Sequence, residues 1–142
     1  MMDATVEKAF NEQMNKEFYS NYIYLAMSAW AESQNLRGVA TWFRTRANEE
    51  LVHANKFYDY LNSRLARVRL AAIAQPPVDW KNALAVFEQA FEHEQFITRS
   101  ISETLTVARQ KSDHAAEVFL QWFVNEQVEE EEVADLAAAQ LR

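Results

Sequence analysis

Glu50 and His53 stand three residues apart in the stretch E-E-L-V-H and have the clearest chemistry in the sequence. On a helix, residues at this spacing share one face, so a carboxylate and an imidazole could bind one metal ion. Steps of three and four residues through the pair give a mostly apolar series: Val39, Phe43, Arg46, Glu50, His53, Phe57 and Tyr60. Both residues are therefore expected on a core-facing stripe, where a charge is costly unless it is compensated.

The composition narrows the class of protein that could carry this pair. The chain has 142 residues, 49% hydrophobic and 13% aromatic, which suits one well-packed domain over residues 1–142. With one glycine and two prolines, long helices are the expected elements. The absence of cysteine excludes disulfides, zinc ribbons, thiol catalysis and thiolate-bound iron.

Charge and hydropathy argue against two classes of partner, nucleic acids and membranes. A net charge of −7 argues against nucleic-acid binding and suits a surface that attracts cations. The first thirty residues carry charge throughout, and no apolar run reaches membrane-spanning length. We therefore expect no signal peptide, no membrane partner and a cytoplasmic location.

Helical periodicity predicts an all-α fold of four long helices. They are expected at about Asp3–Ser33, Gly38–Leu65 and Trp80–Gln110, and from after Lys111-Ser112-Asp113 to the end of the chain. Asp3 and Asp79 are the expected N-caps of the first and third helices.

The segment from Ala66 to Asp79 allows two interpretations. Pro76-Pro77 stops a helix and the apolar residues alternate, yet L-A-R-V-R-L-A-A-I-A favours a helix and nothing there breaks the second one. Extended, about fourteen residues at ~3.3 Å each would return along the bundle and make the second and third helices parallel. If the second helix instead continued to Ala74, Glu94 would miss Glu50 by ~16 Å, and a shared site would need helices exchanged with a partner.

Polar residues interrupt the apolar stripe near the middle of every predicted helix. They are Glu17, Glu50 with His53, Glu94, and Gln127 with Glu130. In a bundle these midpoints meet at one level, where a pair of divalent cations would compensate four buried carboxylates. Oxygen ligands with one imidazole suit iron or manganese, and zinc could use the same ligands. Taken singly, each glutamate could instead be a core-edge residue that reaches solvent.

Four stretches together resemble the ferritin family, specifically the bacterial non-haem ferritins. They are N-E-Q-M-N-K-E-F-Y-S, N-E-E-L-V-H-A, F-E-H-E and F-L-Q-W-F-V-N-E-Q-V-E-E. The resemblance implies a ferritin-like four-helix bundle with one long crossover between the second and third helices.

The resemblance also implies a ligand set for iron. Glu17, Glu50 and His53 would hold the first iron of a ferroxidase centre, and Glu50 would bridge to a second iron at Glu94 and Glu130, with Gln127 beside it. Glu49, Glu126 and Glu129 are similar to the carboxylates of a third iron site that shares Glu130, although a solvated acidic face would also explain these three.

Other residues take their expected roles from the same resemblance. Tyr24 matches a tyrosine beside the centre that hydrogen-bonds a ligand or supplies an electron. Trp122 matches a nearby aromatic residue, for which core packing is the preferred role. His93 and His114 fall off the stripes and are expected at the surface. Haem is not expected, because the fourth helix has Q-V-E-E in place of a second E-x-x-H, and no methionine follows the E-E-L-V-H ligand stretch.

The function implied is that of a ferroxidase, which oxidises Fe(II) to Fe(III) with O2 for iron storage or detoxification. The expected assembly is a homo-oligomer, at least a dimer, with a 24-subunit cage as the larger alternative. The sequence ends at Arg142 without the fifth helix of ferritins, and its crossover lacks the glycines common in relatives. The alternatives are a ferritin-like scaffold with altered association and reduced iron storage, and a di-metal oxidase acting on an organic substrate.

Overall fold

A computed structural model describes residues 1–142 as four α-helices without strands, which confirms the all-α prediction. The helices are α1 (Ala4–Ser33), α2 (Arg37–Ser63), α3 (Ala83–Gln110) and α4 (His114–Ala139). None of them combines the length and apolar character that crossing a membrane requires.

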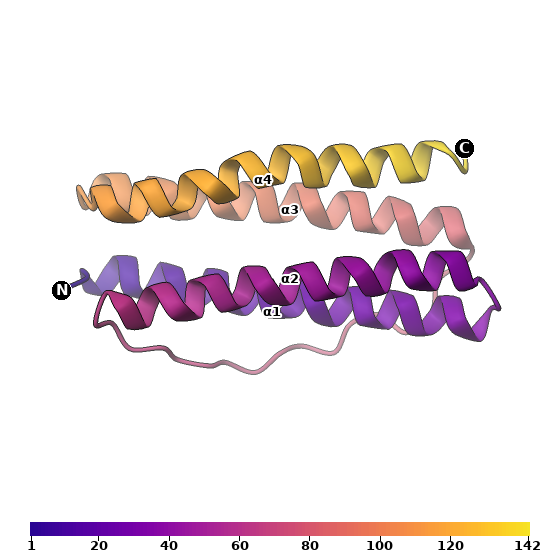
Figure 1. Ribbon diagram of the computed structural model, residues 1–142, viewed down its shortest axis with the longest axis horizontal. Coiled ribbons are helices and arrows are strands. Elements are labelled where there is room, and N and C mark those ends of the chain that lie inside the picture. The colour runs from indigo at the N-terminus through magenta and orange to yellow at the C-terminus, as the bar shows by residue number, and fades with distance from the viewer.

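The helices form two antiparallel hairpins that pack against each other (Figure 1). Helices α1 and α2 make one hairpin, and α3 and α4 make the other. Between the hairpins the chain runs back along the length of the bundle, so that α2 and α3 point the same way (Figure 1). This is the ferritin-like topology predicted from the sequence, and the ambiguous segment is extended rather than helical.

The start of α1 agrees with the predicted cap, whereas the start of α3 does not. The Asp3 carboxylate accepts a hydrogen bond from the Thr5 backbone N–H at 2.7 Å. At α3 the predicted cap Asp79 is wrong, because the cap is Asn82, whose side chain accepts from the Ala85 N–H at 2.8 Å. The helix therefore begins three residues later than the Trp80 predicted from its sequence.

The end of α2 also corrects a prediction. Leu65 has a positive φ of 58°, and the Ala66 N–H bonds back to the Leu61 carbonyl at 2.9 Å. A left-handed residue with this bond closes a helix even without glycine. The expectation that nothing breaks the second helix after Leu65 is therefore wrong.

Side chains of α1 hold the extended crossover in place. The Asn11 amide donates to the Arg67 carbonyl at 2.9 Å, and its oxygen accepts from the Arg69 N–H at 2.7 Å. At the far end, Trp80 packs edge-on against Trp30 with ring centroids 6.0 Å apart. These contacts satisfy backbone groups that a helix would have satisfied internally.

The core consists of two apolar clusters with a polar layer between them. One cluster includes Phe10, Phe57, Ile101, Leu120 and Phe123. The other includes Tyr24, Met27, Phe43, Val86 and Phe87. The polar layer consists of Glu17, Glu50, His53, Glu94, Gln127 and Glu130, all buried. The bundle thus positions six polar side chains at its centre, largely shielded from solvent.

Candidate metal centre

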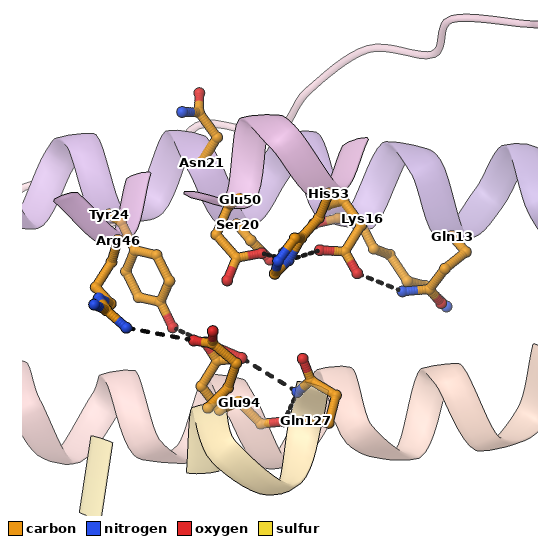
Figure 2. Close-up of polar contacts among 12 residues, drawn as sticks. Gln13, Lys16, Ser20, Asn21, Tyr24, Arg46, Glu50, His53, Glu94 and Gln127 are labelled. Atoms are coloured by element: carbon orange, nitrogen blue, oxygen red, sulfur yellow. Dashed lines mark hydrogen bonds and ion pairs between the residues drawn. The ribbon is translucent and has the colours of Figure 1, made fainter. Parts of the chain in front are cut away.

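The buried carboxylates and the imidazole fall into two groups that share Glu50. The ligand atoms of Glu17, Glu50 and His53 all lie within 4.8 Å of one another, as do those of Glu50, Glu94 and Glu130. Each of these side chains is at most 5% exposed. Figure 2 shows Glu50 and His53 on one hairpin facing Glu94 and Gln127 on the other. The structure therefore brings together all six residues predicted for the centre.

In the first group, His53 lies between two carboxylates. Its Nδ1 is 3.2 Å from Glu50 Oε2 and 3.8 Å from Glu17 Oε2. Burial lowers the pKa of His53, but the two neighbouring carboxylates, Glu17 and Glu50, outweigh it and raise the pKa to about 11. Without metal, a protonated His53 therefore compensates part of the negative charge.

In the second group, Glu94 is fixed by two neighbours. Tyr24 donates its hydroxyl hydrogen to Glu94 Oε2 at 2.7 Å, and the Gln127 amide donates to Glu94 Oε1 at 3.3 Å. Burial nevertheless raises the pKa of Glu94 to about 7. The predicted positions of Tyr24 and Gln127 beside the carboxylates thus agree with the geometry (Figure 2).

The remaining carboxylates also hold protons more tightly than they would in water. Burial and the charge of Glu94 raise the pKa of Glu130 to about 8, although Arg46 opposes this. Burial and Glu94 likewise raise the pKa of Glu50 well above its ordinary value. Such shifts mean that the cluster lacks enough positive charge to be fully ionised.

The donor set suits a pair of divalent cations. Glu17 Oε2 is buried and has no hydrogen-bond partner, although it points toward His53. An unpaired buried carboxylate oxygen is costly, and a cation would remove that cost. Four carboxylates supply hard oxygen ligands and His53 adds an imidazole, a set that fits Fe(II) or Mn(II), and also Zn(II).

The residues predicted for a third iron site are only partly brought together. The ligand atoms of Glu126 lie within 4.8 Å of those of His53 and Glu130. Glu49 instead pairs with Arg46 at 3.3 Å, and Glu129 is exposed on α4. The structure thus groups Glu126 with Glu130 and adds His53, a residue that was not expected in the third site.

Three further side chains test the sequence predictions. Trp122 is 40% exposed and lies over His53 with ring centroids 5.4 Å apart, so its expected role in core packing is wrong. His93 is only partly at the surface, because it is half-buried between α1 and α3 with Nε2 2.7 Å from Ser20 Oγ. Burial lowers the pKa of His93 to about 4. His114 is exposed, as predicted.

Two residues that contact the centre were not identified as site residues from the sequence. Arg46 on α2 reaches Glu130 Oε2 at 3.9 Å, and Gln13 on α1 donates to Glu17 Oε1 at 3.3 Å (Figure 2). Both lie on the core stripes of their helices. A polar residue on an apolar stripe was therefore the signal that could have identified them.

Comparison with known proteins agrees with this geometry. The family model described as Ferritin-like domain matches residues 7–141. A bacterial non-heme ferritin of Campylobacter jejuni is 42% identical over 131 residues, covering 92% of this chain and 78% of that protein. A bacterial non-heme ferritin of Staphylococcus aureus is 37% identical and covers 92% of this chain and 79% of its own length.

Solved ferritin structures share the fold of this chain. An open pore ferritin from the archaeon Archaeoglobus fulgidus has a TM-score of 0.98 at 42% identity, covering 100% of this chain and 88% of that one. A ferritin from Chlorobium tepidum has a TM-score of 0.97 at 36% identity, covering 100% and 87%. Fold, buried acidic centre and sequence agree, and the chain belongs to the ferritin family.

Proposed function

We propose that the protein is a ferroxidase, which binds two Fe(II) ions as substrate and passes their electrons to O2. The observation that carries this proposal is the convergence of four buried carboxylates and His53 in two groups joined by Glu50. Glu17, Glu50 and His53 would bind the first iron, and Glu50, Glu94 and Glu130 the second. Metals held by a shared carboxylate sit close enough to act on one oxidant molecule.

The chain's own residues would favour oxidation by their charge. Carboxylates stabilise Fe(III) more than Fe(II), because the attraction grows with the charge of the ion. Tyr24 keeps Glu94 in position through its 2.7 Å hydrogen bond, and Gln127 holds the other oxygen of the same carboxylate. Each iron would give one electron to O2, which together with two protons from solvent would become hydrogen peroxide, and the product Fe(III) would then leave for storage.

Substitution of Glu94 by alanine tests the proposal. Glu94 belongs to the second group and is 2% exposed, so its loss should abolish rapid oxidation. The measurement is anaerobic titration with Fe(II) followed by O2 uptake. The parent protein should bind two Fe(II) per chain and oxidise them together.

The matched control is Glu103→Ala, which removes an exposed carboxylate from the same helix. It should leave both the stoichiometry and the rate unchanged. An unchanged rate in Glu94→Ala would reject the site, and oxidation of iron by the parent protein no faster than in buffer would reject the ferroxidase.

We further propose that the chain works as a homo-oligomer. Tyr22, Ile73 and Val78 are 41–63% exposed around a cavity of about 740 Å³ between α1 and the crossover. Exposed apolar patches mark sites of association, and we take a second copy of this chain as the partner. Light scattering should give a mass of at least two chains, and a monomer at micromolar concentration would contradict this assembly.

The same cavity bears on the alternative of an organic substrate. Its lining consists of residues from α1 and the crossover, and none of the six central polar residues contributes to it. A substrate bound there would not reach the carboxylates, so iron is the substrate that the geometry favours.

A further inference from the structure

A line of hydrogen bonds connects the Glu17 carboxylate to a lysine near the surface. Gln13 is fully buried, and its Nε2 donates to Glu17 Oε1 at 3.3 Å (Figure 2). The Gln13 amide oxygen accepts from the Ser100 hydroxyl, which in turn lies 2.9 Å from Lys16 Nζ. The line therefore crosses from α1 to α3 and back.

The chemistry of these groups sets the direction of every bond. A lysine ammonium only donates, so Ser100 must accept from Lys16 and keeps its own hydrogen free to donate. That hydrogen goes to the Gln13 oxygen, which leaves the Gln13 NH2 group facing Glu17. The Thr104 hydroxyl lies 3.5 Å from the same Gln13 oxygen and also 2.9 Å from the Ser100 backbone carbonyl. Because Lys16 carries a positive charge, it polarises each hydrogen bond of the line in turn. The Gln13 NH2 group thereby becomes a stronger donor to the Glu17 carboxylate.

The consequence for Glu17 is that its two oxygens have different roles. Oε1 is held by Gln13, whereas Oε2 is buried without a partner and lies 3.8 Å from His53 Nδ1. Rotation of the carboxylate would break the bond to Gln13 and turn Oε2 away from the cluster. The free oxygen is thus kept facing the position that a cation would occupy.

We propose that Lys16, Ser100 and Gln13 are positioning residues that orient Glu17 and thereby set the affinity of the first metal position. This inference rests on the proposed function, because it requires that Glu17 bind metal. Groups that hold a metal ligand in place commonly contribute about 10–100-fold in affinity. We expect a loss of that size when Gln13 is replaced.

The test is an anaerobic titration with Co(II), followed by its visible absorption, on the full chain. Gln13→Leu keeps the size of the side chain and removes both hydrogen bonds. It should weaken one of the two Co(II) binding constants by about 10–100-fold and leave the other within about twofold. Ser100→Ala should have a smaller effect on the same constant, because the Thr104 hydroxyl, 3.5 Å from the same Gln13 oxygen, can still donate to it.

Asn11→Leu is the matched control. Asn11 is a buried amide on the same helix, but it bonds to the crossover at Arg67 and Arg69 rather than to a carboxylate. It should lower thermal stability without changing either binding constant. If Gln13→Leu does not fold, Ser100→Ala and Gln13→Met decide the question by the same readout.

The outcomes separate the two hypotheses. Binding of two Co(II) by the parent protein with unchanged constants in Gln13→Leu and Ser100→Ala would overturn the positioning role and leave the proposed centre standing. Equal weakening of both constants would also overturn it, since a general loss of packing has that effect. Absence of Co(II) binding by the parent protein would overturn the centre and this inference together.

Discussion

At the scale of residues, the centre holds more protons than the same groups would in the unfolded chain. Above pH 6.5 the unfolded chain has released the protons of its glutamates and most of those of its histidines. The folded protein without metal still holds protons on Glu94, Glu130 and His53, whose pKa values are about 7, 8 and 11. Stability falls with pH wherever the folded state binds more protons.

We therefore predict that the metal-free protein loses stability between pH 6.5 and 8.5. The melting temperature in the presence of a chelator should decrease steadily over this range. His93 acts in the opposite direction, because its pKa of about 4 lets the unfolded chain bind the extra proton, but this contribution is nearly complete above about pH 7.5. Glu130→Gln, which cannot ionise, should flatten the slope, and an equal slope in this variant would refute the assignment to Glu130.

The sequence predicted which residues form the centre better than it predicted what surrounds them. Glu17, Glu50, His53, Glu94, Gln127 and Glu130 stood out because each is polar on an apolar stripe, a property visible within one helix. Gln13 and Arg46 share that property, but their partners Ser100 and Glu130 lie on other helices. Single-helix periodicity contains no information on such contacts, so their roles required the packed structure.

At the scale of elements, the end of α2 is an unusual helix terminus. Leu65 adopts a φ of 58° with its side chain 82% exposed. A left-handed backbone costs a residue with a Cβ roughly 1–2 kcal/mol, which glycine avoids. The helix nevertheless ends there, because the crossover must turn back along α1.

Leu65→Gly should therefore stabilise the protein. Removal of the backbone strain raises the free energy of unfolding, but the greater conformational freedom of glycine in the unfolded chain offsets part of this increase. The net increase should be about 0.5–1 kcal/mol. Chemical denaturation gives this quantity as a shift of the midpoint. Leu70→Gly is the control, because Leu70 is also exposed but has a negative φ. That control should not stabilise, and stabilisation of both variants alike would contradict the explanation by backbone strain.

The end of α2 also shows which part of the secondary structure could not be predicted from the sequence. The stripe of α1 was predictable throughout, since Val6, Phe10, Met27 and Ala31 recur at helical spacing and all are buried. The segment after Leu65 has residues with good helix propensity. Its extended form depends on hydrogen bonds to Asn11, about 56 residues away in the chain. Local propensity cannot include such a partner.

At the scale of the whole molecule, the metal ligands are divided between the two hairpins. Helices α1 and α2 supply Glu17, Glu50 and His53, while α3 and α4 supply Glu94 and Glu130. A bound pair of cations would therefore attract the hairpins to each other. Without cations, the carboxyl groups that face each other across this interface hold protons instead, and this attraction is missing.

We predict that divalent cations raise the melting temperature strongly. At a free concentration 100 times the dissociation constant, one cation adds about 2.7 kcal/mol, or on the order of 5–10 °C for a chain of this size. Differential scanning calorimetry with Co(II) or Zn(II) measures this shift. The shift should be much smaller in Glu94→Ala, and an equal shift there would mean that the cations stabilise the fold from another site.

The long crossover of Figure 1 is the one covalent connection between the hairpins, and it lies outside the bundle along α1. A cut between Leu70 and Pro76 would leave each hairpin with its own loop and its own share of the ligands. The two fragments would reassemble through the apolar clusters that both hairpins share, and a dissolved cation would strengthen that association. The crossover is therefore a suitable place to divide the chain, and the two fragments could form a complementation sensor for divalent metal.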